Sequence, residues 1–183
     1  MSETDGAPVK AVADPETYRE SLNGWMKTQM PDATSLRVHD VDMPRATGFS
    51  NETVFFSTTA ITAGVEETKK WVARIEPPDG GLFPEQTKEC GISCEVQHRI
   101  MSAVRESGSV PIPEMLPFES DLSVLGRGFF VMEFIEGVIP ADVPRYTQSG
   151  FLVDKATPAD RERMVRDACE TMATLAGLDW KKL

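Results

Sequence analysis

The sequence predicts an α+β fold: an antiparallel sheet of about five strands with one packed helix, followed by the first helices of a second, helical part. Two observations lead to this prediction. Between residues 36 and 75, three segments rich in β-branched and aromatic residues are joined by short connections, which is typical of neighbouring antiparallel strands. Further along, Gly128–Ile135 is apolar or glycine apart from Glu133, the pattern of a strand buried on both faces.

Composition limits the possible functions. The 183 residues are 40% apolar, enough to bury a core, and carry a net charge of −10 with a pI near 4.7. Such an acidic chain is not suited to nucleic acid. Three cysteines indicate a reducing compartment, hence a cytoplasmic location, and two histidines without a Cys-x-x-Cys pair argue against a zinc site. No apolar run approaches a membrane span and the N-terminus does not resemble a signal peptide, so we expect no membrane contact.

The first element expected is a helix that begins after a disordered lead-in of residues 1–13. Asp14 and Pro15 supply an N-cap and a first-turn proline, and Pro31 ends the helix. One face of this helix is apolar and carries Tyr18, Leu22, Trp25 and Met26. Residues 1–33 therefore form a tail and a helix that precede the main domain at 34–137.

Three strands are expected next. Leu36–Met43 alternates apolar and polar residues, the pattern of a half-buried strand. A turn at Gly48–Glu52 leads into a strand at Thr53–Thr59, and a polar turn at Gly64–Lys69 leads into a third strand at Lys70–Ile75.

The turn that contains Gly48, Ser50 and Asn51 has two interpretations. Small residues can present backbone N–H groups and hydroxyls to a phosphate without steric obstruction. An ordinary hairpin turn has the same composition, and the single glycine is fewer than phosphate-binding fingerprints contain.

Arg74 is the cation of the third strand. It shares one face of that strand with Val72, whereas Trp71, Ala73 and Ile75 share the other. It is either a surface arginine or a bidentate partner for a phosphate or carboxylate.

A helix is expected at Thr87–Glu106, with an apolar stripe of Ile92, Val96, Ile100, Ala103 and Val104. Glu95 lies beside this stripe. It either pairs with Arg99 one turn later or reaches across to Arg74.

Two further strands complete the expected sheet. Pro111–Leu116 has the prolines of an edge strand. The buried strand Gly128–Ile135 ends at Glu136-Gly137, where free backbone groups are available to pair with a flat heterocycle such as adenine; an ordinary exit turn explains the same residues.

The last part, residues 138–183, combines a linker with a long helix. Val138–Ala156 has no clear periodicity, and Thr157 opens a helix with a start like a capping box. The stripe of that helix contains Met164, Val165, Ala168, Met172, Leu175 and Ala176.

Taken together, these pieces resemble the N-terminal lobe of the protein-kinase-like fold, and most closely the aminoglycoside phosphotransferase family. Within that family the chain is similar to the branch related to kinase-like domains fused to acyl-CoA dehydrogenases. The residues that carry the resemblance are Gly48-Phe49-Ser50-Asn51, Val72-Ala73-Arg74 followed by Pro77-Pro78, Glu95, and Val131 to Gly137.

The resemblance implies a site for ATP or GTP with Mg²⁺. Gly48, Ser50 and Asn51 would cover the phosphates, and Arg74 would contact the α- and β-phosphates while paired with Glu95. The family has lysine at position 74. Arginine keeps the charge but changes the geometry of the contact.

The resemblance also implies a pocket for the base. Glu133 and Ile135 would offer a backbone carbonyl and N–H to adenine, and Met132 would shape the back of the pocket. Family members place a catalytic aspartate in a later His-x-Asp loop, and no histidine follows His98 here. We therefore expect no catalytic residue or metal ligand in this chain, which we interpret as a fragment with an incomplete helical lobe at 138–183.

The leading hypothesis is the nucleotide-binding part of a phosphotransferase that acts on a small hydroxylated acceptor. A second hypothesis is a non-catalytic kinase-like interaction module that uses its last helix to bind a partner or to form a homodimer. A plain structural domain without a ligand is the third.

Overall fold

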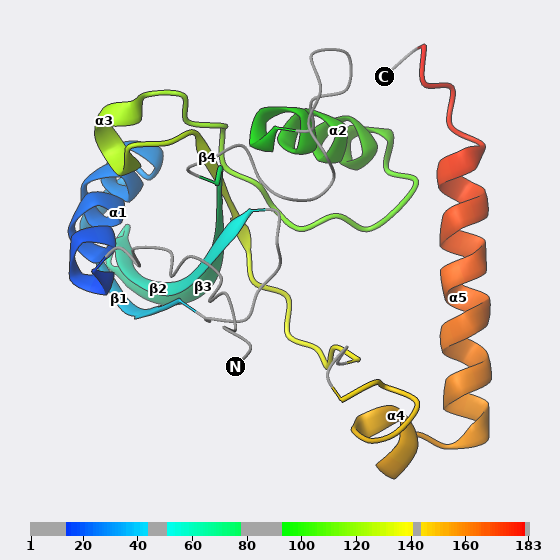
Figure 1. The fold of residues 1–183 in the computed structure, drawn as a ribbon. Coiled ribbons are helices and arrows are strands. Elements are labelled where there is room, and N and C mark those ends of the chain that lie inside the picture. Colours follow the sequence, from blue (N-terminus) through cyan, green and yellow to red (C-terminus); the bar gives the residue numbers. More distant parts are fainter. Residues whose placement is uncertain (1–13, 44–50, 78–92, 141–143, 182–183) are drawn as a thin grey trace, which may run out of the picture. The chain divides into compact units, whose positions relative to one another are not determined.

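The computed structural model describes residues 14–43, 51–77, 93–140 and 144–181. The expected lead-in at 1–13 and the turn at 48–50 lie outside these ranges. The chain has an α+β arrangement of helices and one antiparallel sheet (Figure 1). In chain order the elements are α1 (Pro15–Gln29), β1 (Ala33–Asp42), β2 (Glu52–Thr62), β3 (Val65–Ile75), α2 (Cys94–Ser107), α3 (Leu122–Leu125), β4 (Phe129–Glu133), α4 (Phe151–Asp154) and α5 (Pro158–Ala176).

The strands form an antiparallel sheet in the order β1-β2-β3-β4. β2 and β3 are joined by Ala63 and Gly64, which have φ angles of 51° and 80°. A two-residue turn with both φ angles positive matches the right-handed twist of a hairpin. The predicted polar turn at Gly64–Lys69 was therefore too long: β3 begins at Val65, and its polar first half is the exposed end of the hairpin.

The expected fifth strand at Pro111–Leu116 is absent from the described part of the chain, where the sheet has four strands. Two isolated bridges, Met115 with Met132 and Glu119 with Phe129, run beside β4 instead. Prolines at 111, 113 and 117 cannot donate to a ladder, which explains why pairing stays intermittent.

The boundaries of β4 and α2 also differ from the predictions. β4 stops at Glu133, two residues before the predicted end, although Phe129, Phe130 and Val131 are buried as expected. α2 is described from Cys94 to Ser107, one residue past the predicted end; residues 87–92 of the predicted helix lie outside the described ranges.

α1 supplies the helical side of the core. Asp14 caps it by accepting a hydrogen bond from the backbone N–H of Glu16, and a proline occupies its first turn. Its buried face is the predicted set, Tyr18, Leu22, Trp25 and Met26. Trp25 meets Phe129 of β4 edge to face, with ring centroids 4.9 Å apart, and α3 lies beside α1 (Figure 1).

The chain divides into two compact units. The first comprises residues 1–95 and 115–133, and the second 96–114 and 134–183. The predicted division at residues 33 and 137 stays a prediction. In the second unit α5 has the predicted capping box between Thr157 and Asp160, and the short helix α4 lies in the segment predicted to be a linker. Among the described residues, no helix has the length and apolar character needed to cross a membrane.

Two glycine-to-alanine substitutions test the hairpin and α1. We expect Gly64→Ala to lower the free energy of unfolding by about 1 kcal/mol, because a side chain is strained at positive φ. Gly24→Ala, at an exposed position inside α1 with open space around the new methyl group, should raise it by about 0.5–1 kcal/mol. Urea unfolding followed by circular dichroism measures both; an unchanged Gly64→Ala midpoint would contradict the turn.

Candidate functional site

The two faces of the sheet have different surroundings. Trp71, Ala73 and Ile75 of β3 belong to the core cluster that includes α1. Val72 and Arg74 project from the opposite face, as the alternation predicted. Cross-strand pairing places Thr53 and Phe130 on either side of Arg74, and Phe55 and Met132 on either side of Val72. We call these six residues the open face, meaning the side of the sheet away from α1; Thr53, Val72 and Phe130 on it are buried, and Phe55, Arg74 and Met132 are half-buried.

Arg74 is the charged residue of the open face. Its guanidinium donates a hydrogen bond from Nη1 to Oγ1 of Thr53, with a distance of 2.6 Å. Burial lowers the pKa of Arg74 from its ordinary value, but a guanidinium stays charged at neutral pH. Arg74 is thus a half-buried, charged guanidinium whose Nη1 donates to Thr53.

Glu95 does not pair with Arg74. Glu95 is the second residue of α2 and is exposed. Within the ranges that the structure describes, no ion pair joins Glu95 to Arg74 or to Arg99, so neither predicted pairing is present. Arg74 therefore faces the open side of the sheet without a carboxylate partner among the described residues.

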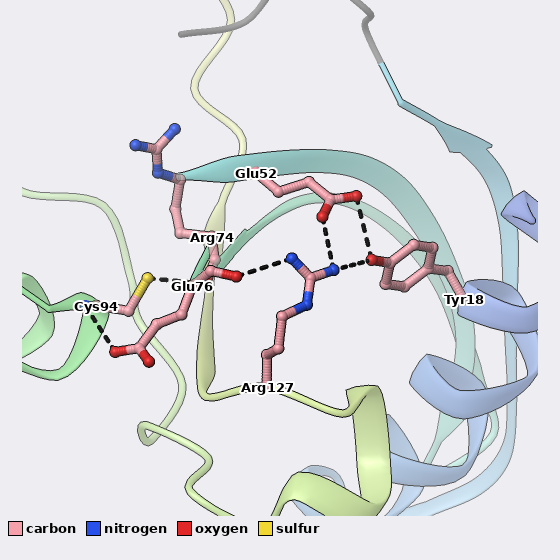
Figure 2. Close-up of polar contacts among 6 residues, drawn as sticks. All are labelled: Tyr18, Glu52, Arg74, Glu76, Cys94 and Arg127. Atoms are coloured by element: carbon pink, nitrogen blue, oxygen red, sulfur yellow. Dashed lines mark hydrogen bonds and ion pairs between the residues drawn. The ribbon is translucent and has the colours of Figure 1, made fainter. Parts of the chain in front are cut away.

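A second guanidinium, that of Arg127, lies between α1 and the ends of β2 and β3 (Figure 2). Its Nη2 donates to Oε2 of Glu52 and to the hydroxyl of Tyr18, each at 2.6 Å, and its Nη1 donates to the carbonyl of Glu76 at 2.8 Å. Burial, followed by the charge of Glu52, raises the pKa of Tyr18 to about 12, so its hydroxyl stays protonated and donates to Glu52. We call Tyr18, Glu52, Glu76 and Arg127 the Arg127 cluster.

Cys94 joins the start of α2 to the end of β3. Its backbone N–H donates to Oε1 of Glu76 at 3.1 Å, and its Sγ lies 3.6 Å from the carbonyl oxygen of Arg74 as a donor (Figure 2). Burial, followed by the charge of Glu76, raises the pKa of the Cys94 thiol to about 12. The thiol is therefore protonated and can donate this hydrogen bond.

The other predicted nucleotide contacts are placed unevenly. Gly48 and Ser50 lie outside the described residues. Asn51 is buried, with 5% of its surface exposed, at the start of β2. Met132 and Glu133 are half-buried at the end of β4, and Ile135, in the second unit, is 61% exposed.

Three residues of this region were missed by sequence reasoning. Thr53 had a detectable signal, because a hairpin places it opposite Arg74. Glu76 and Arg127 had none: their partners are 18 and up to 109 residues away in the chain, and only the folded sheet brings them together.

The described residues offer little to a metal ion. No group of three or more histidine, cysteine, aspartate or glutamate side chains that could hold one occurs among them.

The described elements are those of a kinase-like N-terminal lobe. They are a four-stranded antiparallel sheet with a cation on its third strand, a helix that begins beside that strand, and a buried fourth strand. The comparison with protein families agrees. Residues 43–182 match the phosphotransferase enzyme family, known as APH. Because the match covers more than half of the chain, the chain belongs to this family, which confirms the resemblance predicted from the motifs.

Curated relatives lie in the branch that the motifs indicated. Acyl-CoA dehydrogenase family member 11 is 29% identical over 132 residues in Rattus norvegicus, covering 72% of this chain and 14% of the relative. In Mus musculus it is 28% identical, covering 89% of this chain and 18% of the relative. Probable acyl-CoA dehydrogenase IBR3 of Arabidopsis thaliana is 27% identical, covering 61% and 12%. The chain thus spans less than a fifth of these relatives.

Thiol labelling tests the placement of Cys94. Cys94 is fully buried with a raised pKa, whereas Cys169 is exposed. Because the thiolate is the reactive form, brief iodoacetamide treatment at pH 8 should modify Cys169 and leave Cys94 intact, as read by peptide mass spectrometry. In urea both should react. Equal labelling of the two in the folded protein would contradict the site.

Proposed function

We propose that this chain is the nucleotide-binding part of a phosphotransferase, in which ATP or GTP lies against the open face and donates its γ-phosphate to a hydroxyl of a small molecule. Membership of the phosphotransferase family supports the general reaction. One observation carries the assignment of the site: Arg74 is a half-buried cation on the open face, and among the described residues its side chain has one hydrogen bond, to Thr53.

Partial burial of the Arg74 guanidinium favours an anionic ligand. A guanidinium has five N–H donors, and Thr53 occupies one of those of Arg74. Burial removes part of the water that would satisfy the rest, as the lowered pKa of Arg74 indicates. A phosphate oxygen pair fits the fork of a guanidinium and returns the lost interaction as charge-assisted hydrogen bonds. Nucleotide phosphates therefore match Arg74 better than water does.

The base and the phosphate-covering turn complete the proposal. Phe55 and Met132 are half-buried and flank the buried Val72 in the sheet register, and they would offer apolar contacts to adenine or guanine. The backbone of Glu133 and of Ile135 would pair with the edge of the base, and Gly48, Ser50 and Asn51 would cover the phosphates. We infer that Glu95 takes a phosphate-site role only if it turns toward Arg74 on nucleotide binding.

The reaction needs two further parts. Magnesium would be held by the nucleotide phosphates and by carboxylates, and another group would position the acceptor hydroxyl. We assign neither part to a residue that the structure describes. When bound, the magnesium nucleotide supplies the phosphoryl group. Free Cys94 and Cys169 suit a reducing compartment, which supports a cytoplasmic location.

Arg74→Ala tests the proposed site. We expect it to weaken binding of the magnesium nucleotide by about 10- to 100-fold, because hydrogen bonds to charged groups contribute about 1.5–3 kcal/mol. Arg74→Lys should lose less, since it keeps the charge but not the fork. Isothermal titration calorimetry with ATP and with GTP measures the dissociation constants.

Arg37→Ala is the matched control, because Arg37 is an exposed arginine of β1 that shares the sheet face of Arg74 through its pairing with Thr59. The Arg37→Ala variant should bind the magnesium nucleotide with the same affinity as the unmodified chain. Equal affinity in Arg74→Ala would remove the proposed role of Arg74.

The second candidate function, a non-catalytic interaction module that forms a homodimer, is favoured by α5. Its apolar side chains are exposed: Met164 38%, Val165 66%, Met172 65% and Leu175 41%. Exposed apolar side chains that gather on one helix can mark an interaction site.

If α5 pairs with a second copy, sedimentation velocity should show a dimer that Val165→Glu combined with Met172→Glu converts to a monomer, because charges are costly in an apolar interface. The control Glu162→Gln should leave the dimer intact. A monomer at all accessible concentrations would remove the reason for this second function.

A further inference from the structure

We propose that Glu76 is a positioning residue for the nucleotide site, and that its carboxylate, with Cys94, takes the structural place predicted for an Arg74–Glu95 ion pair. This inference rests on the proposed function of Arg74. It concerns how the end of β3 and the first residue of α2 are held together, and all of its contacts lie within the first unit of the chain.

The main chain of Glu76 is fixed on both sides. Its N–H donates to the carbonyl of Gly128 at 2.9 Å, and its carbonyl accepts from Nη1 of Arg127 at 2.8 Å. The preceding residue, Ile75, is paired with both neighbouring strands. Glu76 is thus an anchored point two residues after Arg74.

The side chain of Glu76 extends from this point to α2. Its Oε1 accepts the N–H of Cys94, the first residue of the helix. The first N–H groups of a helix have no partner within the helix and carry the positive end of its dipole, so a carboxylate is the favoured acceptor. The Glu76 carboxylate therefore fastens the helix start to the end of β3.

One more contact ties Cys94 to the site. The thiol of Cys94 donates to the carbonyl of Arg74, so the same residue contacts Glu76 through its backbone and Arg74 through its side chain. Gly128 packs close to these residues: an added Cβ would lie 3.6 Å from Cδ of Glu76, an ordinary contact, and 2.8 Å from the ring of Phe118. A larger residue at 128 would therefore displace the ring of Phe118.

In this arrangement Glu76, and not Glu95, connects α2 to the end of β3. An ion pair with Glu95 would occupy the fork of Arg74. With the helix held by Glu76 instead, the guanidinium is left to Thr53 and to an anion on the open face. A small misplacement of a binding group can lower affinity or rate by a large factor. We therefore expect loss of the Glu76–Cys94 hydrogen bond to displace Arg74 and to weaken nucleotide binding.

The test compares Glu76→Ala and Glu76→Gln with the control Glu66→Ala, which changes an exposed glutamate of β3. Glu76→Ala should weaken nucleotide binding about tenfold and speed amide hydrogen exchange at Cys94. Glu76→Gln keeps an acceptor oxygen and should restore both toward the unmodified chain. Glu66→Ala should change neither.

A double-mutant cycle separates positioning from general stability. If Glu76 acts through Arg74, Glu76→Ala should have no further effect on affinity in the Arg74→Ala background. Equal losses in both backgrounds, or unchanged affinity in Glu76→Ala while Arg74→Ala is weakened, would overturn this inference and leave the proposed function in place. Unchanged affinity in Arg74→Ala would overturn the proposed function itself.

Discussion

The lobe depends most on the hydrogen bonds of the Arg127 guanidinium. These bonds join Arg127, which lies just before β4, to Tyr18 of α1, to Glu52 at the start of β2 and to the carbonyl of Glu76 after β3. The side chains of Arg127 and Glu52 are only 20% and 23% exposed. Removing one partner would leave a charge that is largely shielded from water unpaired, which is costly. We therefore expect Arg127 and its three partners to become ordered together during folding.

The two guanidinium groups have different surroundings. On one face of the sheet α1 packs its apolar residues against β3 and β4, and the Tyr18 hydroxyl of α1 accepts a hydrogen bond from Arg127. The Arg74 guanidinium points away from the Arg127 cluster (Figure 2) and donates to Thr53. Because Arg127 has three hydrogen-bond partners within the protein, we propose only Arg74 as a nucleotide contact.

Local signals predicted much of the fold. The cap at Asp14, the capping box at Thr157 and the alternation around Arg74 depend on neighbouring residues, and each is present. The polar half of β3 was missed because exposed hairpin residues have no apolar pattern. The contact between Glu76 and the start of α2 was not predicted, because Glu76 and Cys94 are 18 residues apart and only the folded sheet brings them together.

The most direct test of the account is a map of where a nucleotide binds. Methyl NMR spectra of the chain, recorded with and without a magnesium nucleotide, report each face separately. The account predicts shifts for Val72 and Met132 on the open face and little change for Val38 and Val54, which face α1. Shifts confined to Val38 and Val54, or no shift at millimolar nucleotide, would contradict it.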